Sequence, residues 1–231
     1  MKLSLVIPCF NEGPNVPKLI KRLNQVFNSN EFQVILVDNG STDNTKELVN
    51  NLLEDNRLIR FLRIEKNLGY GYGILEGLKL AEGDYIGWTH ADLQTDPSDA
   101  LIALNLINHF EEKVFLKGSR MGRTIFDKFF TFSMSIFEFI ILGRLMWDIN
   151  AQPTIFSRDL YETWKNPPID FSLDLFAFYT AKLNGYSIRR FPVNFPKRIY
   201  GTSHWNMDFK SKLKFIKRTL NFSLELKSRL N

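Results

Sequence analysis

Short apolar runs alternate with helically spaced apolar positions through the first half of the chain. The runs predict strands, and the spaced segments between them predict helices. The expected strands cover residues 3–7, 33–37, 58–64 and 85–88, and the expected helices cover 16–27, 44–54 and 74–81. The strands are continuous and rich in Leu or β-branched residues, which is typical of a parallel sheet buried under helices on both faces. The pattern therefore predicts an α/β fold with a mostly parallel, Rossmann-like sheet.

The second half predicts further elements and two unusual helices. Helices are expected at 98–110, 173–183 and 209–230, with strands at 114–117, 154–156 and 187–192. From Phe129 to Leu142 the only charge is Glu138. This run is shorter than the ~20 apolar residues that span a bilayer, yet it is too apolar for an ordinary surface helix. We expect an apolar insert at about 125–147 within a domain of residues 1–205, and a basic amphipathic helix over 206–231.

Composition narrows the class of protein. The 231 residues fit one large α/β domain, and 44% apolar with 24% charged residues excludes wholesale disorder. The single cysteine, Cys9, excludes an internal disulfide framework and lies at the end of an apolar strand. A buried thiol is expected there rather than a nucleophile. Because no segment has the pattern of a secretory signal, we expect a cytoplasmic protein.

Charge is distributed unevenly along the chain. The net charge is +5, but the residues from Lys197 onward hold nine Lys or Arg against two acids, a local balance of +7. A basic tail indicates an anionic partner. Zinc-finger spacing and aromatic RNA-binding motifs are missing from the sequence, so we expect an anionic membrane surface and no nucleic acid.

An acidic turn follows the fourth expected strand, where Trp88 leads into Thr-His-Ala-Asp-Leu-Gln. Carboxylate and amide oxygens, here those of Asp92 and Gln94, are the ligands that Mg²⁺ and Mn²⁺ prefer. Such a turn can hold a divalent cation against a diphosphate. Ordinary capping of the helix that begins near Pro97 is the alternative.

Polar groups also follow the first three strands. Asn11 and Glu12 offer hydrogen-bonding groups for a base, and Asp38 can accept from a base or a ribose. Residues 41–45 are expected chiefly to cap the next helix. The glycines after Asn67 let backbone amides approach a phosphate at a helix start, but they depart from the dinucleotide fingerprint, which disfavours NAD.

Together these motifs resemble the family 2 glycosyltransferases, in particular the dolichol- or polyprenyl-phosphate mannosyltransferase branch. The resemblance is carried, in order, by Ile-Pro-Cys-Phe-Asn-Glu at 7–12, Val-Asp-Asn-Gly-Ser-Thr-Asp at 37–43, Asn-Leu-Gly at 67–69, Glu-Gly-Asp at 82–84 and Ala-Asp-Leu-Gln at 91–94. It is strong over residues 3–120 and looser to about 205. It implies a GT-A fold, a UDP- or GDP-sugar donor, Mg²⁺ or Mn²⁺, and inversion at the anomeric carbon.

The resemblance also implies site residues. In the family's pattern Asp92 and Gln94 ligate the metal, Arg120 ends a Gly-Ser-Arg motif near phosphate, and Arg198 opens an Arg-x-x-Gly-x-Ser loop with Gly201 and Ser203. An arginine fork suits phosphate geometry. The positions that would bind the nucleotide are Pro8, Asn11, Glu12, Asp38, Asn67, Gly69 and Ala91.

One position departs from the family pattern. His90 stands where the acidic motif usually begins with Asp. This removes a negative charge, which lowers metal affinity or shifts preference toward Mn²⁺. Alternatively, His90 contacts a phosphate, a role that is also open to Ser203, or it has a purely structural role.

The acceptor decides the chemistry. A polyprenyl phosphate attacks with an oxygen that is already anionic, whereas a saccharide hydroxyl, as in cell-surface polysaccharide synthesis, needs a carboxylate base. Asp148 and Asp174 are the candidates. We place Asp148 near the acceptor as a catalytic residue and favour a structural role for Asp174.

The last helix sets apolar positions at 209, 213, 216, 220 and 224 beside lysines and arginines at 210, 214, 217 and 218. Such a helix can lie on the inner face of the membrane, with the apolar insert beside it. Packing on the domain, or a homodimer, is the alternative. Two rival functions remain: a sugar nucleotidyltransferase, whose glycine-rich loop after the first strand is not present, and a non-catalytic scaffold with a lost metal site.

Overall fold

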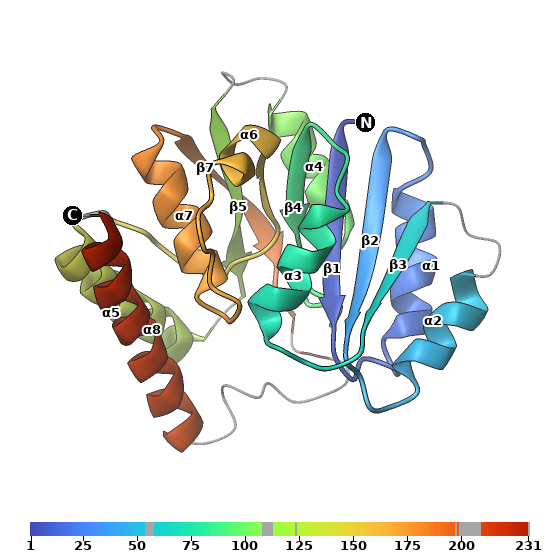
Figure 1. The fold of residues 1–231 in the computed structure, drawn as a ribbon, viewed down its shortest axis with the longest axis horizontal. Helices are drawn as coiled ribbons and strands as arrows, with labels where there is room; N and C mark the ends of the chain where they lie inside the picture. The colour runs from blue at the N-terminus through green and yellow to red at the C-terminus, as the bar shows by residue number, and fades with distance from the viewer. Residues whose placement is uncertain (54–57, 108–112, 123, 197, 199–208, 231) are drawn as a thin grey trace.

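The computed structural model describes residues 1–53, 58–107, 113–122, 124–196, 198 and 209–230. Within them a seven-stranded sheet has the order β3-β2-β1-β4-β6-β5-β7 (Figure 1). Only β6 runs antiparallel, between β4 and β5. The strands are β1 Leu3–Cys9, β2 Phe32–Asn39, β3 Ile59–Ile64, β4 Tyr85–Trp88, β5 Val114–Met121, β6 Thr154–Ser157 and β7 Ser187–Asn194.

Helices cover both faces of the sheet (Figure 1). They are α1 Val16–Val26, α2 Thr45–Leu53, α3 Tyr70–Lys79, α4 Ser98–Ile107, α5 Ile125–Leu142, α6 Arg158–Glu162, α7 Leu173–Leu183 and α8 Phe209–Leu230. Alternate residues of one strand serve the two cores: Leu5 packs with α1, α2 and α4, whereas Val6 packs with α3 and α7. This two-sided burial explains why the strands read as continuous apolar runs.

The expected α/β fold is confirmed, with several boundary differences. β5 continues through Gly118, Ser119 and Arg120, because its last residues pair in parallel with β7. The five-residue α6 had no signal in the apolar spacing. α3 begins at Tyr70, four residues earlier than expected, and includes Gly71. A Cβ on Gly71 would lie 2.6 Å from the Asp170 carbonyl oxygen, so glycine permits close packing of the helix on that loop.

α5 and α8 lie side by side at one end of the molecule (Figure 1). α5 turns a broad apolar face outward, formed by Ile125, Phe129, Phe132, Ile136, Phe137, Phe139 and Ile140, which we call the α5 apolar face. Ile125 is 83% exposed and Ile140 is 68% exposed. None of the helices among the described residues combines the length and apolar character needed to cross a bilayer.

The packed face of α8 differs from the stripe expected from its sequence. Phe222, Ser223 and Leu226 are buried, whereas Leu224 is 57% exposed. The exposed Leu224 belongs to the stripe predicted to face a membrane, whereas α8 packs on α5 through a different face, on which the Ser223 hydroxyl donates to Glu138 at 2.6 Å. The side chains at 209–215 lie outside those that the structure describes.

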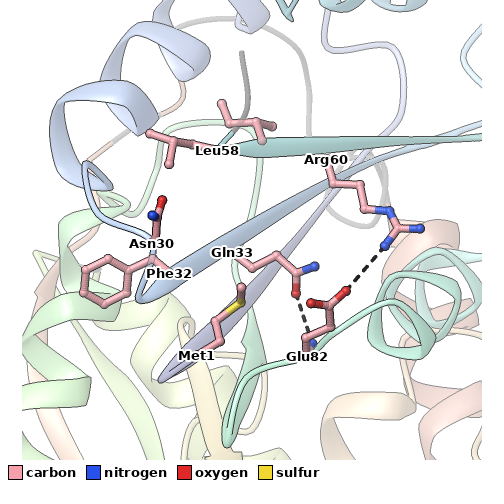
Figure 2. Close-up of a pocket in the computed structure, with 8 residues that line it drawn as sticks. Met1, Asn30, Phe32, Gln33, Leu58, Arg60 and Glu82 are labelled. Atoms are coloured by element: carbon pink, nitrogen blue, oxygen red, sulfur yellow. Dashed lines mark hydrogen bonds and ion pairs between the residues drawn. The ribbon is translucent and has the colours of Figure 1, made fainter.

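A hollow of about 510 Å³ lies at the amino ends of β1, β2 and β3 (Figure 2). Its polar groups satisfy one another: Arg60 lies 3.8 Å from Glu82, and the Gln33 side chain accepts from the Glu82 amide at 3.0 Å. Since ligands of open parallel sheets bind at the carboxyl ends of the strands, this hollow is on the wrong edge for the expected site.

Candidate functional site

The loops with the predicted site residues share one edge of the sheet. β2, β1 and β4 are neighbours and run parallel, so the loops after them emerge together. Glu12, Asp38 and Asp92 therefore lie at the same edge, the lower one in Figure 1. Electrostatic coupling of Glu12 to Asp92 agrees with this placement. Burial raises the pKa of Glu12, and a 2.6 Å hydrogen bond from Asn15 opposes the rise.

The second loop holds the first in place. Three consecutive amides, at residues 11–13, donate at 2.9–3.1 Å to the side chains of Ser41, Thr45 and Asp43. The side-chain oxygen of Asn11, a residue with φ of 57°, accepts from the Thr42 amide at 2.8 Å. Residues 41–45 thus do more than the capping expected of them, because they fix the turn that presents Asn11 and Glu12.

Asp38 is fully buried and already engaged. One oxygen accepts from the Ser41 amide at 2.9 Å, and the other pairs with Arg63. Arg63 also donates to the Ser41 carbonyl at 3.0 Å. Sequence reasoning missed Arg63, a charged residue of the edge strand β3 that the sheet register sets directly opposite Asp38.

The loop after β3 reaches the same edge. The Asn67 side chain accepts from the Gly69 amide at 3.0 Å, and Asn39 donates to the Gly69 carbonyl at 2.8 Å. Gly40, with φ of 77°, allows a close approach, since a Cβ there would lie 2.4 Å from the Asn67 amide nitrogen. Of the remaining predicted positions at this edge, Pro8 is near the end of β1 and Ala91 is buried beside Asp92.

The acidic turn holds a cation of the chain itself. Arg198 lies 2.8 Å from Asp92 Oδ2 and donates from Nε to Gln94 Oε1, also at 2.8 Å. The Gln94 amide group donates to the Pro196 carbonyl at 2.9 Å. Asp92 Oδ1 accepts from the Gln94 backbone at 3.1 Å. The side chains of the two residues expected to bind metal therefore lie close together, and the Arg198 guanidinium contacts both of them.

The donor set fits a divalent ion shared with a substrate. No group of three or more His, Cys, Asp or Glu able to hold a metal exists among the described residues. Mg²⁺ is commonly held by one or two carboxylates, waters and substrate phosphates rather than by an all-protein cage. Asp92 and Gln94 supply one carboxylate and one amide oxygen, and the arginine on them shows that the pair attracts positive charge.

His90 lies beneath this turn. Its ring centre is 5.8 Å from that of Tyr70, which stacks on Phe171 at 4.6 Å. Burial lowers the pKa of His90, while Asp92 and Asp174 act in the opposite direction. A neutral imidazole is therefore favoured where a carboxylate was expected.

Asp148 forms a second cluster with two arginines. Arg120 Nε lies 3.0 Å from Asp148 Oδ1, and Arg190 lies 3.8 Å from Oδ2. Arg190 also donates to the Gly118 carbonyl at 2.8 Å. Asp148 is 4% exposed. Arg190 was missed because its partner lies far away in sequence.

Asp174 forms a third, fully enclosed cluster. It lies 3.4 Å from Lys117 Nζ and accepts from Gln152 at 2.8 Å. Lys117 donates to Thr154 at 2.6 Å, and burial lowers its pKa to about 8. Gln152 also approaches the Tyr70 hydroxyl at 3.4 Å, which links this cluster to the ring beside His90. These contacts agree with a structural role for Asp174.

Two predicted residues, Gly201 and Ser203, lie outside the described residues. Cys9 is buried, and burial raises its pKa well above the ordinary value, as expected of an inert thiol.

The sheet order and the groups at its carboxyl edge define an α/β protein with the GT-A fold. The chain belongs to glycosyl transferase family 2, whose family model matches residues 4–156. Among curated relatives, it is 34% identical over 102 residues to the undecaprenyl-phosphate 4-deoxy-4-formamido-L-arabinose transferase of Proteus mirabilis, covering 42% of this chain and 31% of the relative. The chain spans less than a third of the length of the curated relatives it matches.

Solved structures share the fold at low identity. Glucosyl-3-phosphoglycerate synthase from Mycobacterium tuberculosis, with Mn²⁺, UDP and glucosyl-3-phosphoglycerate, superposes with a TM-score of 0.71 at 16% identity, covering 98% of this chain and 79% of that one. The mannosyltransferase PcManGT from Pyrobaculum calidifontis, with GDP-Man and Mn²⁺, gives a TM-score of 0.63 at 15% identity, covering 99% and 73%. The synthase is also known with Mg²⁺ and UDP.

Proposed function

We propose that the chain transfers a hexose from a UDP- or GDP-sugar to a polyprenyl phosphate, with inversion at the anomeric carbon. The observation that carries the proposal is that the Asp92–Gln94 turn, with Arg198 on it, and Arg120 near the end of β5 share one sheet edge. The Proteus relative, whose name includes undecaprenyl-phosphate, supports the acceptor. The solved neighbours with UDP and GDP-Man support the donor class.

In this proposal the nucleoside lies against the loops after β1 and β2, near Asn11, Glu12 and Asp38. The diphosphate points toward Asp92 and Gln94. A bound Mg²⁺ or Mn²⁺ supplies positive charge to the leaving diphosphate. The remaining nucleotide contacts are assigned to Pro8, Asn67, Gly69 and Ala91. His90, favoured as a neutral imidazole, serves as a hydrogen-bonding group rather than an anionic ligand.

The state of the two candidate bases favours an anionic acceptor. Asp148 is held by Arg120 and Arg190, and Asp174 is held by Lys117. Both carboxylates are already engaged by these cations, so neither is open to take a proton from a sugar hydroxyl. A phosphate oxygen needs no such step. We assign Asp148 the positioning of Arg120, whose guanidinium meets the acceptor phosphate.

The lipid acceptor also gives a use for the α5 apolar face. A Phe-rich helix face this exposed suits burial at an acyl-chain boundary. Lysines and arginines of the segment from Lys197 onward would attract an anionic leaflet. We propose that residues 1–205 form the transferase domain and that residues 206–231 assist its peripheral attachment to the inner face of the cytoplasmic membrane.

The acceptor is tested by nucleoside diphosphate release. Purified protein with Mn²⁺ and a panel of UDP- and GDP-sugars is given undecaprenyl phosphate, undecaprenol or a soluble saccharide. Of the three acceptors, we expect only undecaprenyl phosphate to cause release of the nucleoside diphosphate, because only that acceptor carries an anionic nucleophile. Turnover on the saccharide without a lipid phosphate would falsify the acceptor assignment.

Calorimetric titration separates the rival functions. Metal-dependent binding of UDP or GDP supports the transferase. Preference for a nucleoside triphosphate supports a nucleotidyltransferase. Failure to bind any nucleotide, with or without Mn²⁺, supports a scaffold.

A further inference from the structure

The oxygens assigned to the metal are engaged by one side chain. Arg198 contacts Asp92 Oδ2 at 2.8 Å and Gln94 Oε1 at 2.8 Å, so a single guanidinium bridges both residues. Gln94 is held from its other end by the Pro196 carbonyl, at 2.9 Å. The segment after β7 is thereby docked on the turn after β4, although the two are more than 100 residues apart in sequence.

A guanidinium and a divalent cation compete for these oxygens, because two positive charges at this short distance repel each other. Asp92 is 3% exposed, so an unpaired charge on its carboxylate is costly, and Arg198 stabilises it before any ligand arrives. A metal bound to the same oxygens repels Arg198 at short range and so favours its displacement. Metal entry by itself is therefore opposed by the chain.

We propose that Arg198 is a built-in competitor of the metal, released from Asp92 and Gln94 only when a nucleoside diphosphate offers it a new anionic partner. The inference rests on the proposed function, since it takes a metal-bound diphosphate as the donor group. Arginine forks bind phosphate well, so the displaced guanidinium has a partner of matching geometry next to the site it leaves. Metal and nucleotide then bind cooperatively, each favouring the other by the same factor.

The test measures Mn²⁺ binding without turnover, by electron paramagnetic resonance and calorimetry, with and without UDP or GDP. In Arg198→Gln, affinity for Mn²⁺ alone rises roughly tenfold, because the competing ion pair is gone. The same variant loses most of the gain in Mn²⁺ affinity that the nucleotide confers. Arg198→Lys, which keeps the charge but not the fork, lies between the variant and the wild type.

A matched control exists on the same turn. Arg22 pairs with Asp96 at 2.9 Å on the surface, so Arg22→Gln removes an arginine–aspartate pair that does not involve Asp92 or Gln94 and leaves both affinities unchanged. Unchanged or weaker Mn²⁺ binding in a folded Arg198→Gln overturns the competition, while nucleotide-dependent Mn²⁺ binding in the wild type still supports the proposed function. If the wild type binds neither Mn²⁺ nor a nucleoside diphosphate under any of these conditions, both proposals fail.

Discussion

Lys117 is the most deeply buried cation described in the sheet, and its environment explains why it remains charged. Asp174 at 3.4 Å and the Thr154 hydroxyl at 2.6 Å offset the loss of water that lowers its pKa to about 8. Gln152 contacts both Asp174 and Tyr70, so the ion pair also helps to fix the Tyr70 ring that lies next to His90. At the residue scale, the buried charges of Lys117 and Asp174 help to position the residues next to the site.

Removal of one member of this pair should be far worse than removal of both charges. Lys117→Met leaves Asp174 uncompensated and is expected to lower the free energy of unfolding by about 3–5 kcal/mol. The double variant Lys117→Met/Asp174→Asn should regain most of the lost stability, since the Asn oxygen can still accept from Gln152. Urea unfolding of the three proteins measures the coupling.

Lys79→Met is the surface control for that cycle. Lys79 pairs with Glu76 at 2.6 Å in the open, so its loss should change the free energy of unfolding by less than ~1 kcal/mol. Equal destabilisation by the single and double core variants would contradict a coupled pair.

The elements were largely predictable, because burial of the sheet on both faces leaves continuous apolar runs such as that of β2. Boundaries failed where pairing overrode local composition: β5 extends through the polar residues Ser119 and Arg120 because β7 pairs with it. The hydropathy pattern contains no information on strand direction, so it could not predict that β6 runs antiparallel. Site loops were found by their positions after strands, whereas Arg63 and Arg190 were missed because their partners depend on register and tertiary contact.

At the element scale, the contact between α5 and α8 should depend on pH through Glu138. Burial raises its pKa to about 7, the Ser223 hydroxyl opposes the rise, and Oε1 has no hydrogen-bond partner among the described residues. The folded state holds this proton more tightly than the unfolded chain, so the contribution of Glu138 to stability is greatest at low pH. It falls by about 3 kcal/mol as the pH rises from about 4.5 through about 7.

Glu138→Gln removes the titration and keeps a group that can accept from Ser223. We expect the variant to gain stability over the wild type at about pH 8 and little at about pH 5.5, measured by urea unfolding. Glu225→Gln, at an exposed position of α8, should show no such pH-dependent gain. A constant difference between Glu138→Gln and the wild type at both pH values would rule out this origin.

The α5 apolar face yields the test of membrane attachment. Phe129→Ser, Phe139→Ser and Ile140→Ser together should abolish co-sedimentation with anionic vesicles while changing the melting temperature little, since these side chains are at least half exposed. Leu52→Ser with Ile102→Ser removes exposed apolar groups from other helices and should leave binding intact. If the triple variant instead loses a dimer that the wild type forms, and vesicle binding is unchanged, the face serves self-association.

At the scale of the whole molecule, the site exists only when distant segments meet. Asn11 and Glu12 are fixed by the loop after β2, and the turn after β4 is held by Arg198 beyond β7. A ligand that contacts all of them binds the folded chain and not the unfolded one. Binding must then raise stability, by about 2.7 kcal/mol when its concentration is a hundred times its Kd.

Asp92→Ala makes that linkage specific to the proposed donor. The variant should retain the fold, because Asp92 lies in a loop and Arg198, the cation that pairs with it, has a side chain that is 29% exposed and can be solvated. It should nevertheless lose turnover and lose the rise in melting temperature that Mn²⁺ with UDP or GDP gives the wild type, since the shared cation loses its carboxylate ligand. Thermal melts of both proteins, with metal and nucleotide added singly and together, measure this. Retained turnover in Asp92→Ala would refute the metal assignment, and an equal shift from nucleotide alone would show that the diphosphate binds without the cation.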